Sequence, residues 1–284
     1  MLIVLDVEKA VHKNIAGRLR SLIHPYEITT RVKKQNRVTV LYIRYSSHRG
    51  AVRFKKIYEY MIGAPKTILC SSELSLEGTP FTRFESNELK KHLMMNLVTS
   101  IIRRLGHTAE QLKLGFYDPM AENSQLASRL LTDIPELTVV SDMPRFYERE
   151  SERLTEEMGA SFLVSNSPER LSGCDIVICP EKTEQRLPVS DNTLIFTTCK
   201  PRVSMKGTVI YEYLPEYPYR YERIKPSDID EVYFLSALYS LCGVKELSEL
   251  VPLKCGDGST LYSTDRLVQR LKRLKTPDEL LRAE

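Results

Sequence analysis

The sequence lacks any apolar run that approaches the roughly 20 residues needed to span a bilayer. Its first residues, MLIVLDVEKAVHKN, reach the charged Asp6 and Glu8 after a short apolar stretch, so they lack the long apolar core of a signal peptide. These two absences predict a cytoplasmic protein with no membrane partner.

The signatures of several enzyme and metal-site classes are also missing. Among the six cysteines there is no CxxC pair, and no histidine accompanies them at zinc-ligand spacing. Four of the cysteines lie in or beside apolar segments, which predicts buried, reduced thiols and no metal site. The sequence contains no GxSxG, HExxH, phosphate-binding GxxxxGK(S/T) or EF-hand pattern.

What the chain does contain is typical of a soluble globular protein, with 284 residues of which 42% are hydrophobic and 27% charged. Residues 1–110 carry 19 Lys and Arg against 9 Asp and Glu, whereas residues 111–250 carry 15 against 23. This shift predicts a domain boundary near residue 110. The chain then divides into a small basic domain (1–110), a second domain (111–225) and C-terminal helices (226–284) that pack on the body.

The first part has the pattern of a small mixed α/β domain. Hydrophobic periodicity predicts strands over 2–7, 27–34, 37–46 and 66–71, and helices over 11–23, 52–63 and 87–105. The two middle strands flank a polar turn at Gln35 and Asn36, which is typical of a hairpin. A loop is expected over 76–86. Ser86 is expected to cap the long helix that follows it.

From residue 112 onward, short apolar strands alternate with helices. Strands are predicted over 113–118, 137–142, 160–165, 174–180 and 193–198, and helices over 124–134 and 144–159. Such alternation is typical of a parallel sheet covered on both faces, and right-handed crossovers make it a Rossmann-like doubly wound sheet. Helices over 227–243, capped by Ser227, and over 264–275 complete the chain. The predicted fold class is therefore α/β, a Rossmann-like doubly wound parallel sheet preceded by a smaller mixed α/β domain.

Three features of the second part form a recognisable pattern: a strand that ends in Asp142, a helix that ends in EEMGA, and a GCDIVIC strand. Over residues 113–200 this pattern resembles the NAD(P)-binding Rossmann domain of shikimate dehydrogenase and glutamyl-tRNA reductase relatives. The resemblance implies a ligand site at the carboxyl ends of the strands, with Asp142 as a hydrogen-bond acceptor for a ribose hydroxyl. Asp142 is alternatively an N-cap for the helix that begins at Pro144.

The first turn departs from that family. Where that family has a glycine-rich phosphate loop, this sequence has DPMAENS (118–124), in which Pro119 has no backbone N–H to donate. Asp118 and Glu122 would also place negative charge beside a diphosphate. The sequence leaves the cofactor open and disfavours NAD(P). If a dinucleotide does bind, its candidate contacts are Asp118, Ala121, Ser124, Asp142 and Arg145.

Candidate catalytic residues also follow the strand ends. Glu181 and Lys200 form a candidate acid/base pair, and Cys179 is a candidate nucleophile that would need a nearby base. All five histidines precede residue 110, so a Cys–His pair would join the two parts of the chain. Whether the protein is an enzyme is left open.

Three function hypotheses remain. The first is a Rossmann-like protein that binds a small ligand or partner in a cleft between the two parts, without ordinary dehydrogenase activity. The second is an NAD(P)-dependent oxidoreductase with an unusual phosphate loop. The third is a nucleic-acid-binding protein that uses the basic first domain, where 31–38 and 46–56 carry most of the charge, although no RNA-binding or helix-turn-helix signature is present. The sequence identifies neither the ligand nor the oligomeric state.

Overall fold

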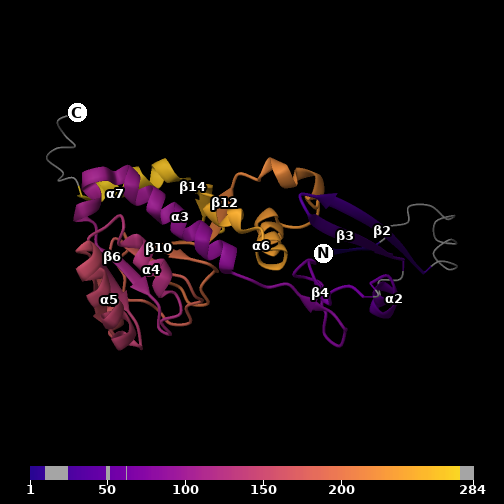
Figure 1. Cartoon of the computed structure of the whole chain (residues 1–284), viewed down its shortest axis with the longest axis horizontal. Helices are drawn as coiled ribbons and strands as arrows, with labels where there is room; N and C mark the ends of the chain where they lie inside the picture. The colour runs from indigo at the N-terminus through magenta and orange to yellow at the C-terminus, as the bar shows by residue number, and fades with distance from the viewer. Residues whose placement is uncertain (10–24, 49–51, 62, 276–284) are drawn as a thin grey trace. The chain divides into compact units, whose positions relative to one another are not determined.

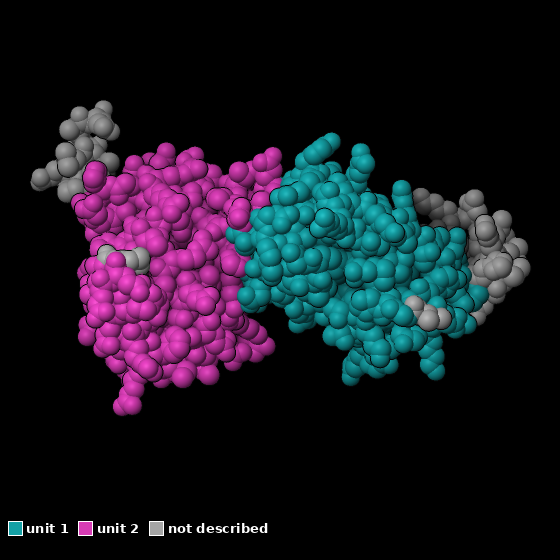
Figure 2. All heavy atoms as spheres, in the orientation of Figure 1, with its two compact units in different colours: residues 1–89, 217–248 teal, residues 90–216, 249–284 magenta. Residues whose placement is uncertain are grey.

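The computed structural model describes residues 1–9, 25–48, 52–61 and 63–275 (Figure 1). The chain forms two compact units, each built from two separate stretches (Figure 2). Unit 1 comprises 1–89 and 217–248, and unit 2 comprises 90–216 and 249–284. These divisions fall at points other than the predicted boundaries at 110 and 225. The long helix α3 (Glu88–Leu105) belongs to unit 2 from Lys90 onward.

Unit 1 is organised around a three-stranded sheet in the order β1-β3-β2. Strand β3 (Val38–Ser47) runs antiparallel to β2 (Tyr26–Gln35) and parallel to β1 (Leu2–Lys9). Between β2 and β3 the chain turns at Asn36 and Arg37, whose φ angles of 47° and 67° match the left-handed geometry that tight hairpins favour. The predicted hairpin is therefore confirmed. The helix predicted over 11–23 lies outside the described residues.

The two faces of this sheet differ in character because side chains alternate along each strand. One face presents Ile3, Leu5, Ile43 and Tyr45 to a buried apolar cluster. That cluster is completed by Ile57 of helix α2 (Phe54–Glu59), a shorter helix than the one predicted over 52–63, and by the segment around β4 (Thr67–Ile68) and β5 (Thr82–Arg83). Strand β5 lies within the predicted loop 76–86. Leu69 extends the sheet beyond β1 through backbone hydrogen bonds of 2.8 Å to Ile3 and Leu5.

The chain returns to unit 1 at the tyrosine-rich segment after residue 216. The 3₁₀ helix η3 (Tyr219–Ile224) is held to the hairpin by side-chain hydrogen bonds, among them one of 2.8 Å from Asn36 to the carbonyl of Arg220. Helix α6 (Glu231–Cys242) follows, and its N-cap is Asp230, whose carboxylate accepts from the backbone N–H of Tyr233 at 2.8 Å. The predicted cap, Ser227, is therefore wrong. Its hydroxyl donates to Asp228 at 2.6 Å instead.

Unit 2 contains a six-stranded sheet in the order β11-β10-β9-β6-β7-β8, and every neighbouring pair is parallel. If these six strands are numbered 1 to 6 along the chain and the sheet is read from β8 to β11, their order is 3-2-1-4-5-6. This is the strand order of the dinucleotide-binding Rossmann fold. The predicted fold class is confirmed. The strands are β6 (Leu114–Tyr117), β7 (Glu136–Val140), β8 (Ser161–Ser165), β9 (Ile176–Cys179), β10 (Leu194–Thr197) and β11 (Thr208–Ile210).

Two α-helices connect the first three strands. Helix α4 (Ser124–Leu130) joins β6 to β7, and α5 (Pro144–Met158) joins β7 to β8 and ends at Gly159, whose φ of 69° suits glycine. Between β8 and β9 stands only a 3₁₀ helix, η2 (Pro168–Gly173). Its Leu171 is buried in an apolar cluster with Val177 and Ile195.

The remaining elements of unit 2 include a small antiparallel sheet. It comprises β12 (Glu212–Pro215), β13 (Pro252–Gly256) and β14 (Leu261–Ser263). Helix α7 (Thr264–Lys275) buries Leu267 and Leu271, while Leu274 remains 38% exposed. The predicted cap of α3 is present too, because the hydroxyl of Ser86 accepts from the N–H of Glu88 at 3.3 Å. Among the described helices none is long and apolar enough to cross a membrane.

Gly115 tests how closely η2 packs on the central strand β6. A Cβ atom at Gly115 would lie 2.6 Å from Cδ2 of the buried Leu171 and 3.0 Å from Sγ of Cys174. We expect Gly115→Ala to lower the free energy of unfolding by about 1–3 kcal/mol, the usual cost of overpacking a core. The matched control is Gly173→Ala, where a Cβ meets nothing within 4 Å. Urea unfolding of the two variants should separate them, and equal stabilities would contradict the packing described here.

Candidate functional site

The carboxyl ends of the parallel strands in unit 2 bring the predicted site residues to one edge of the sheet. Asp118 follows β6, Asp142 follows β7 by two residues, and Glu181 follows β9 by two. The loops they stand on touch. The backbone N–H of Asp142 donates to the carbonyl of Pro119 at 3.0 Å, and the side-chain amide of Asn123 donates to Glu181 at 3.3 Å.

The carboxylate of Asp118 accepts four hydrogen bonds at this edge, and the exposed fraction of Asp118 is 0%. Its carboxylate accepts from the backbone N–H groups of Glu122 and Asn123 at 3.3 and 2.8 Å. It also accepts from the side-chain amide of Asn123 at 3.2 Å and from the hydroxyl of Tyr147 at 2.6 Å. The carboxylate therefore takes up the backbone donors at the start of α4, the position where Rossmann proteins place a pyrophosphate.

Tyr147 is suited to this contact because it stays protonated. Burial, followed by the charge of Asp118, raises the pKa of its phenol well above the ordinary value. Its ring is fully buried and packs edge-on against Phe162 at a centroid distance of 5.4 Å. Tyr147 belongs to α5, so the contact joins α5 to the end of β6.

The loop between β6 and α4 reaches its shape without glycine. Ala121 has a φ of 54°, a left-handed conformation that glycine adopts more readily. Its N–H donates to the carbonyl of Asp118 at 3.1 Å, so this donor too is used within the loop. Ser124 begins α4, a helix of only seven residues.

Asp142 and Arg145 lie exposed at the start of α5. The N-cap of α5 is Met143, and the hydroxyl of Ser141 accepts from its N–H at 3.1 Å, so the alternative of Asp142 as an N-cap is wrong. Within the described part of the chain, neither the Asp142 nor the Arg145 side chain makes a hydrogen bond or ion pair. The role of Asp142 as a ribose acceptor stays a prediction.

The candidate catalytic residues do not form the expected pair. Glu181 forms an ion pair with Lys91 of α3, with 2.5 Å between Nζ and Oε1, while Lys200 is exposed and, among the described residues, forms no ion pair with Glu181. Sequence reasoning missed Lys91 because it lies in a helix far along the chain from Glu181. Cys179 is buried, and burial raises the pKa of its thiol to about 12. Almost no thiolate is present at pH 7, which argues against Cys179 as a nucleophile.

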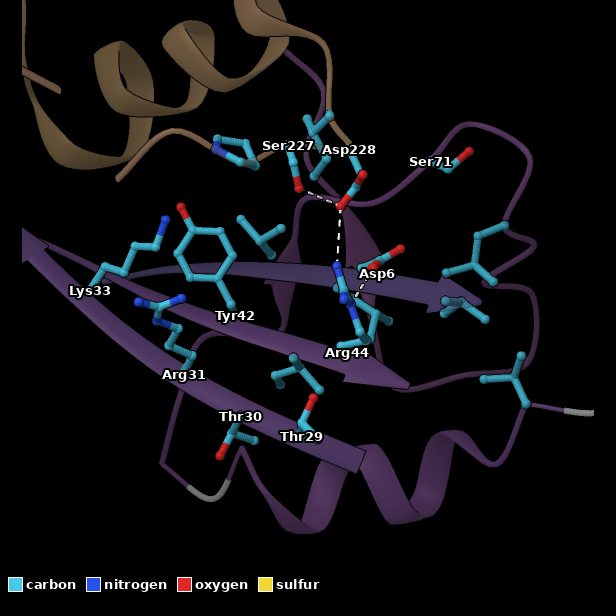
Figure 3. Close-up of a pocket in the computed structure, with 18 of the residues that line it drawn as sticks. Asp6, Thr29, Thr30, Arg31, Lys33, Tyr42, Arg44, Ser71, Ser227 and Asp228 are labelled. Carbon is cyan, nitrogen blue, oxygen red and sulfur yellow. Dashed lines mark hydrogen bonds and ion pairs between the residues drawn. The ribbon is translucent and has the colours of Figure 1, made fainter. Parts of the chain in front are cut away.

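Unit 1 contains a cavity of about 750 Å³ over the second face of its sheet (Figure 3). The strand register arranges its wall in cross-strand rows. Asp6, Arg44 and Thr29 form one row, and Val4, Tyr42 and Arg31 form the next. Lys33 lies two residues beyond Arg31 on β2, and Ser227 and Asp228 line the cavity from the segment before α6.

Five of the seven charged residues of this wall fall into two groups, and the other two are Glu73 and Lys225, of which Lys225 forms an ion pair with Glu231. Arg44 lies between the carboxylates of Asp6 and Asp228, at 3.0 and 3.5 Å. The ammonium of Lys33 lies 5.0 Å above the ring of Tyr42, whose hydroxyl donates to the carbonyl of Ile224. Burial raises the pKa of Tyr42 to about 12. Sequence reasoning noticed Arg31 and Lys33 only as part of a basic stretch, because their common face follows from the register with β3. In the described residues no group of metal-ligating side chains is gathered.

No protein-family model matches the sequence, and no curated protein matches it. Solved structures that align with it include quinate dehydrogenase from Corynebacterium glutamicum in complex with NAD, with 9% identity, 70% of this chain and 80% of that chain covered, and a TM-score of 0.30. L-Tryptophan dehydrogenase from Nostoc punctiforme aligns with 11% identity over 87% of this chain and 76% of that chain, at a TM-score of 0.31. 5-Ketofructose reductase of Gluconobacter sp. strain CHM43 aligns with 11% identity over 96% of this chain and 99% of that chain, at a TM-score of 0.30. At TM-scores this low, the fold class rests on the strand order of the chain itself.

Tyr147→Phe tests the contact with Asp118. The change keeps the ring and removes one donor from a buried carboxylate, so we expect the free energy of unfolding at pH 7 to fall by about 2 kcal/mol. Because the pKa of Tyr147 is raised in the folded state, its hydroxyl stabilises the fold fully below the ordinary value of 10.0. That stability is lost as the pH rises above 10.0, and the gap between wild type and variant should narrow.

Urea unfolding at neutral and alkaline pH measures this gap. Tyr219→Phe is the matched control, because Tyr219 is 89% exposed and its loss should leave stability unchanged. Equal stability of Tyr147→Phe and wild type at pH 7 would show that the hydroxyl contributes nothing to the fold.

Proposed function

We propose that the protein binds a small ligand in the cavity of unit 1 and that its Rossmann-like unit does not work as an ordinary NAD(P)-dependent dehydrogenase. One observation carries the second half of this proposal. The buried carboxylate of Asp118 accepts from the backbone N–H groups of Glu122 and Asn123, which are the donors a pyrophosphate would need.

A dinucleotide fits these residues poorly. At an effective dielectric constant of about 20, two like unit charges 4 Å apart repel by about 4 kcal/mol, so a pyrophosphate beside Asp118 would be strongly disfavoured. Moving the Asp118 side chain away would leave Tyr147 and Asn123 without their buried acceptor. Pro119 offers no donor, and the N–H of Ala121 is already bonded within the loop.

The cavity of unit 1 is the better candidate for a ligand. Its volume of about 750 Å³ lies within the range of roughly 300–1,000 Å³ that small-molecule sites have. Seven of the 21 residues that line it are charged, and apolar side chains such as Val4 and Ile229 are also present, so the cavity suits a ligand with a charged group. The cleft between the two parts that the sequence suggested stays a prediction.

The runner-up is an NAD(P)-dependent oxidoreductase related to the shikimate dehydrogenase and glutamyl-tRNA reductase families. Asp142 favours it, because its side chain is exposed at the carboxyl edge of the sheet, where those families place the ribose-binding acid. This reading requires a dinucleotide to bind without the phosphate contacts of the first loop.

Titration of NAD(H) and NADP(H) into the full chain separates the two proposals. We expect no saturable binding below about 1 mM, which corresponds to about −4.1 kcal/mol. Micromolar binding to the unmodified chain would make the oxidoreductase the leading proposal. In that case Asp142→Asn should weaken binding and Asp133→Asn should not, because Asp133 pairs with Arg103.

The basic hairpin of unit 1 gives the nucleic-acid hypothesis its own test. Arg31, Lys34 and Arg37 are exposed on β2 and its turn, but Arg31 and Lys34 lie on opposite faces of the strand, so they do not form one continuous basic surface. We expect affinity for a random-sequence duplex at physiological salt to stay in the non-specific range of roughly 10⁻⁴–10⁻⁶ M, measured by fluorescence anisotropy. Nanomolar, salt-sensitive binding would instead make nucleic acid the primary partner.

A further inference from the structure

We infer that the cavity of unit 1 takes a small organic anion, whose carboxylate or phosphate group binds Arg31 and whose apolar body lies along the apolar wall. This inference rests on the proposed function, since it names the class of ligand for the same cavity. It depends on how the charged side chains of the wall are paired.

The first step is that Arg44 is already engaged. Its guanidinium lies 3.0 Å from Asp6, 3.7 Å from Glu8 and 3.5 Å from Asp228. The hydrogen bond to Asp6 and the charges of these carboxylates raise the pKa of Arg44. Their three negative charges outnumber its single positive charge, so Arg44 is not free to bind an anion. Arg44 thereby links the segment before α6 to the sheet through Asp228, and this group of side chains carries net negative charge.

The second step is that Arg31 has no such partner. It stands directly across from Tyr42 in the neighbouring row, it is exposed, and among the described residues no carboxylate or carbonyl is recorded against its guanidinium. Lys33 lies on the same face of β2, two residues along, above the Tyr42 ring. Figure 3 shows Arg31 and Lys33 beside Tyr42, apart from the Arg44–Asp6–Asp228 group.

The third step concerns the remaining acid of the wall. Glu73 lines the cavity from the loop after β4, which extends the sheet on the far side of β1. Strand β2 is at the opposite edge of the order β1-β3-β2. The strands β1 and β3 therefore lie between the loop of Glu73 and Arg31 in the strand order, and the charged lining residues on β2 are Arg31 and Lys33, both positive. A planar guanidinium with free donors is the group proteins use for carboxylates and phosphates.

The fourth step concerns the body of the ligand. On the face that carries Arg31, the apolar part of the wall includes Val4, in the same cross-strand row, and Ile229 from the segment before α6. Val7, Val52 and Leu74 also line the cavity, while they pack against the apolar cluster on the other face of the sheet. A fully hydrated inorganic anion would leave these side chains in contact with water. A ligand with a hydrocarbon or aromatic body buries them and gains the usual stabilisation of apolar contact.

Four probes that share one body and differ in head group test the inference. Benzoate and phenyl phosphate are the anions, benzamide is the neutral match, and benzylamine is the cation. Binding to the full chain is measured by ligand-observed NMR and calorimetry. We expect at least one anion to bind at least tenfold more tightly than benzamide, with benzylamine weaker still, and the two anions tell a carboxylate site from a phosphate site.

Two substitutions on β2 test whether the anion binds at Arg31. Arg31→Gln should weaken anion binding about tenfold or more, as expected for the loss of a charge-assisted contact. Lys34→Gln removes the same charge from the same strand, but Lys34 lies on the opposite face and outside the cavity wall, so anion binding should change less than twofold. The melting temperatures of both unliganded variants verify that they fold.

Several results would overturn the inference. Benzamide or benzylamine binding as tightly as the anions, or equal effects of Arg31→Gln and Lys34→Gln, would show a cavity that takes ligands without preferring anions, and the proposed function would survive. Failure of both anions to bind up to about 10 mM would reject the inference as well. The separate titration with dinucleotides decides the proposed absence of ordinary NAD(P) binding whichever way these probes behave.

Discussion

The buried carboxylate of Asp118 is the constraint on which the Rossmann-like unit depends. A charge removed from water is tolerated only when donors surround it, and here they come from the start of α4 and from Tyr147 of α5. The end of β6 is thus tied to both helices that follow it. Most Rossmann proteins leave these donors to a phosphate group. Here the carboxylate of Asp118 accepts from these donors, in a loop that contains no glycine.

The fold was largely predictable because its strands are short, apolar and separated by helices, a pattern that admits few arrangements. Residues 113–200 form the parallel sheet that this pattern predicts. What the sequence did not show was long-range pairing. The return of η3 to the hairpin depends on contacts such as that of Tyr42 with Ile224, which join residues far apart in the chain. The cap of α6 was misplaced for a local reason, since Ser227 and Asp230 both suit an N-cap and only the backbone geometry selects Asp230.

The candidate site was predictable in position but less so in chemistry. Asp118 was singled out as a charge that would repel a diphosphate, and the structure adds that this charge is itself bound by the loop. Glu181 was expected to work with Lys200, yet its lysine is Lys91, contributed by α3. A sequence shows which residues follow a strand, but it does not show which distant helix places a partner against them. The cavity of unit 1 could not be predicted for the same reason. The register of β2 against β3 decides which side chains share the face that lines it.

Two arginines on one face of the unit 1 sheet show how neighbours decide the role of a residue. Arg44 and Arg31 stand on adjacent strands in adjacent rows, and both line the cavity. Arg44 forms ion pairs with Asp6 of β1 and with Asp228, so its charge stabilises the contact between the sheet and the segment before α6. Arg31 stands on β2, at the edge of the sheet formed by the described residues, and among these its cross-strand neighbour is Tyr42. An edge strand has a partner on one side only, so a charged side chain there has fewer chances to be neutralised by the protein itself. The position of Arg31 in the sheet thus explains why its guanidinium is left for a ligand.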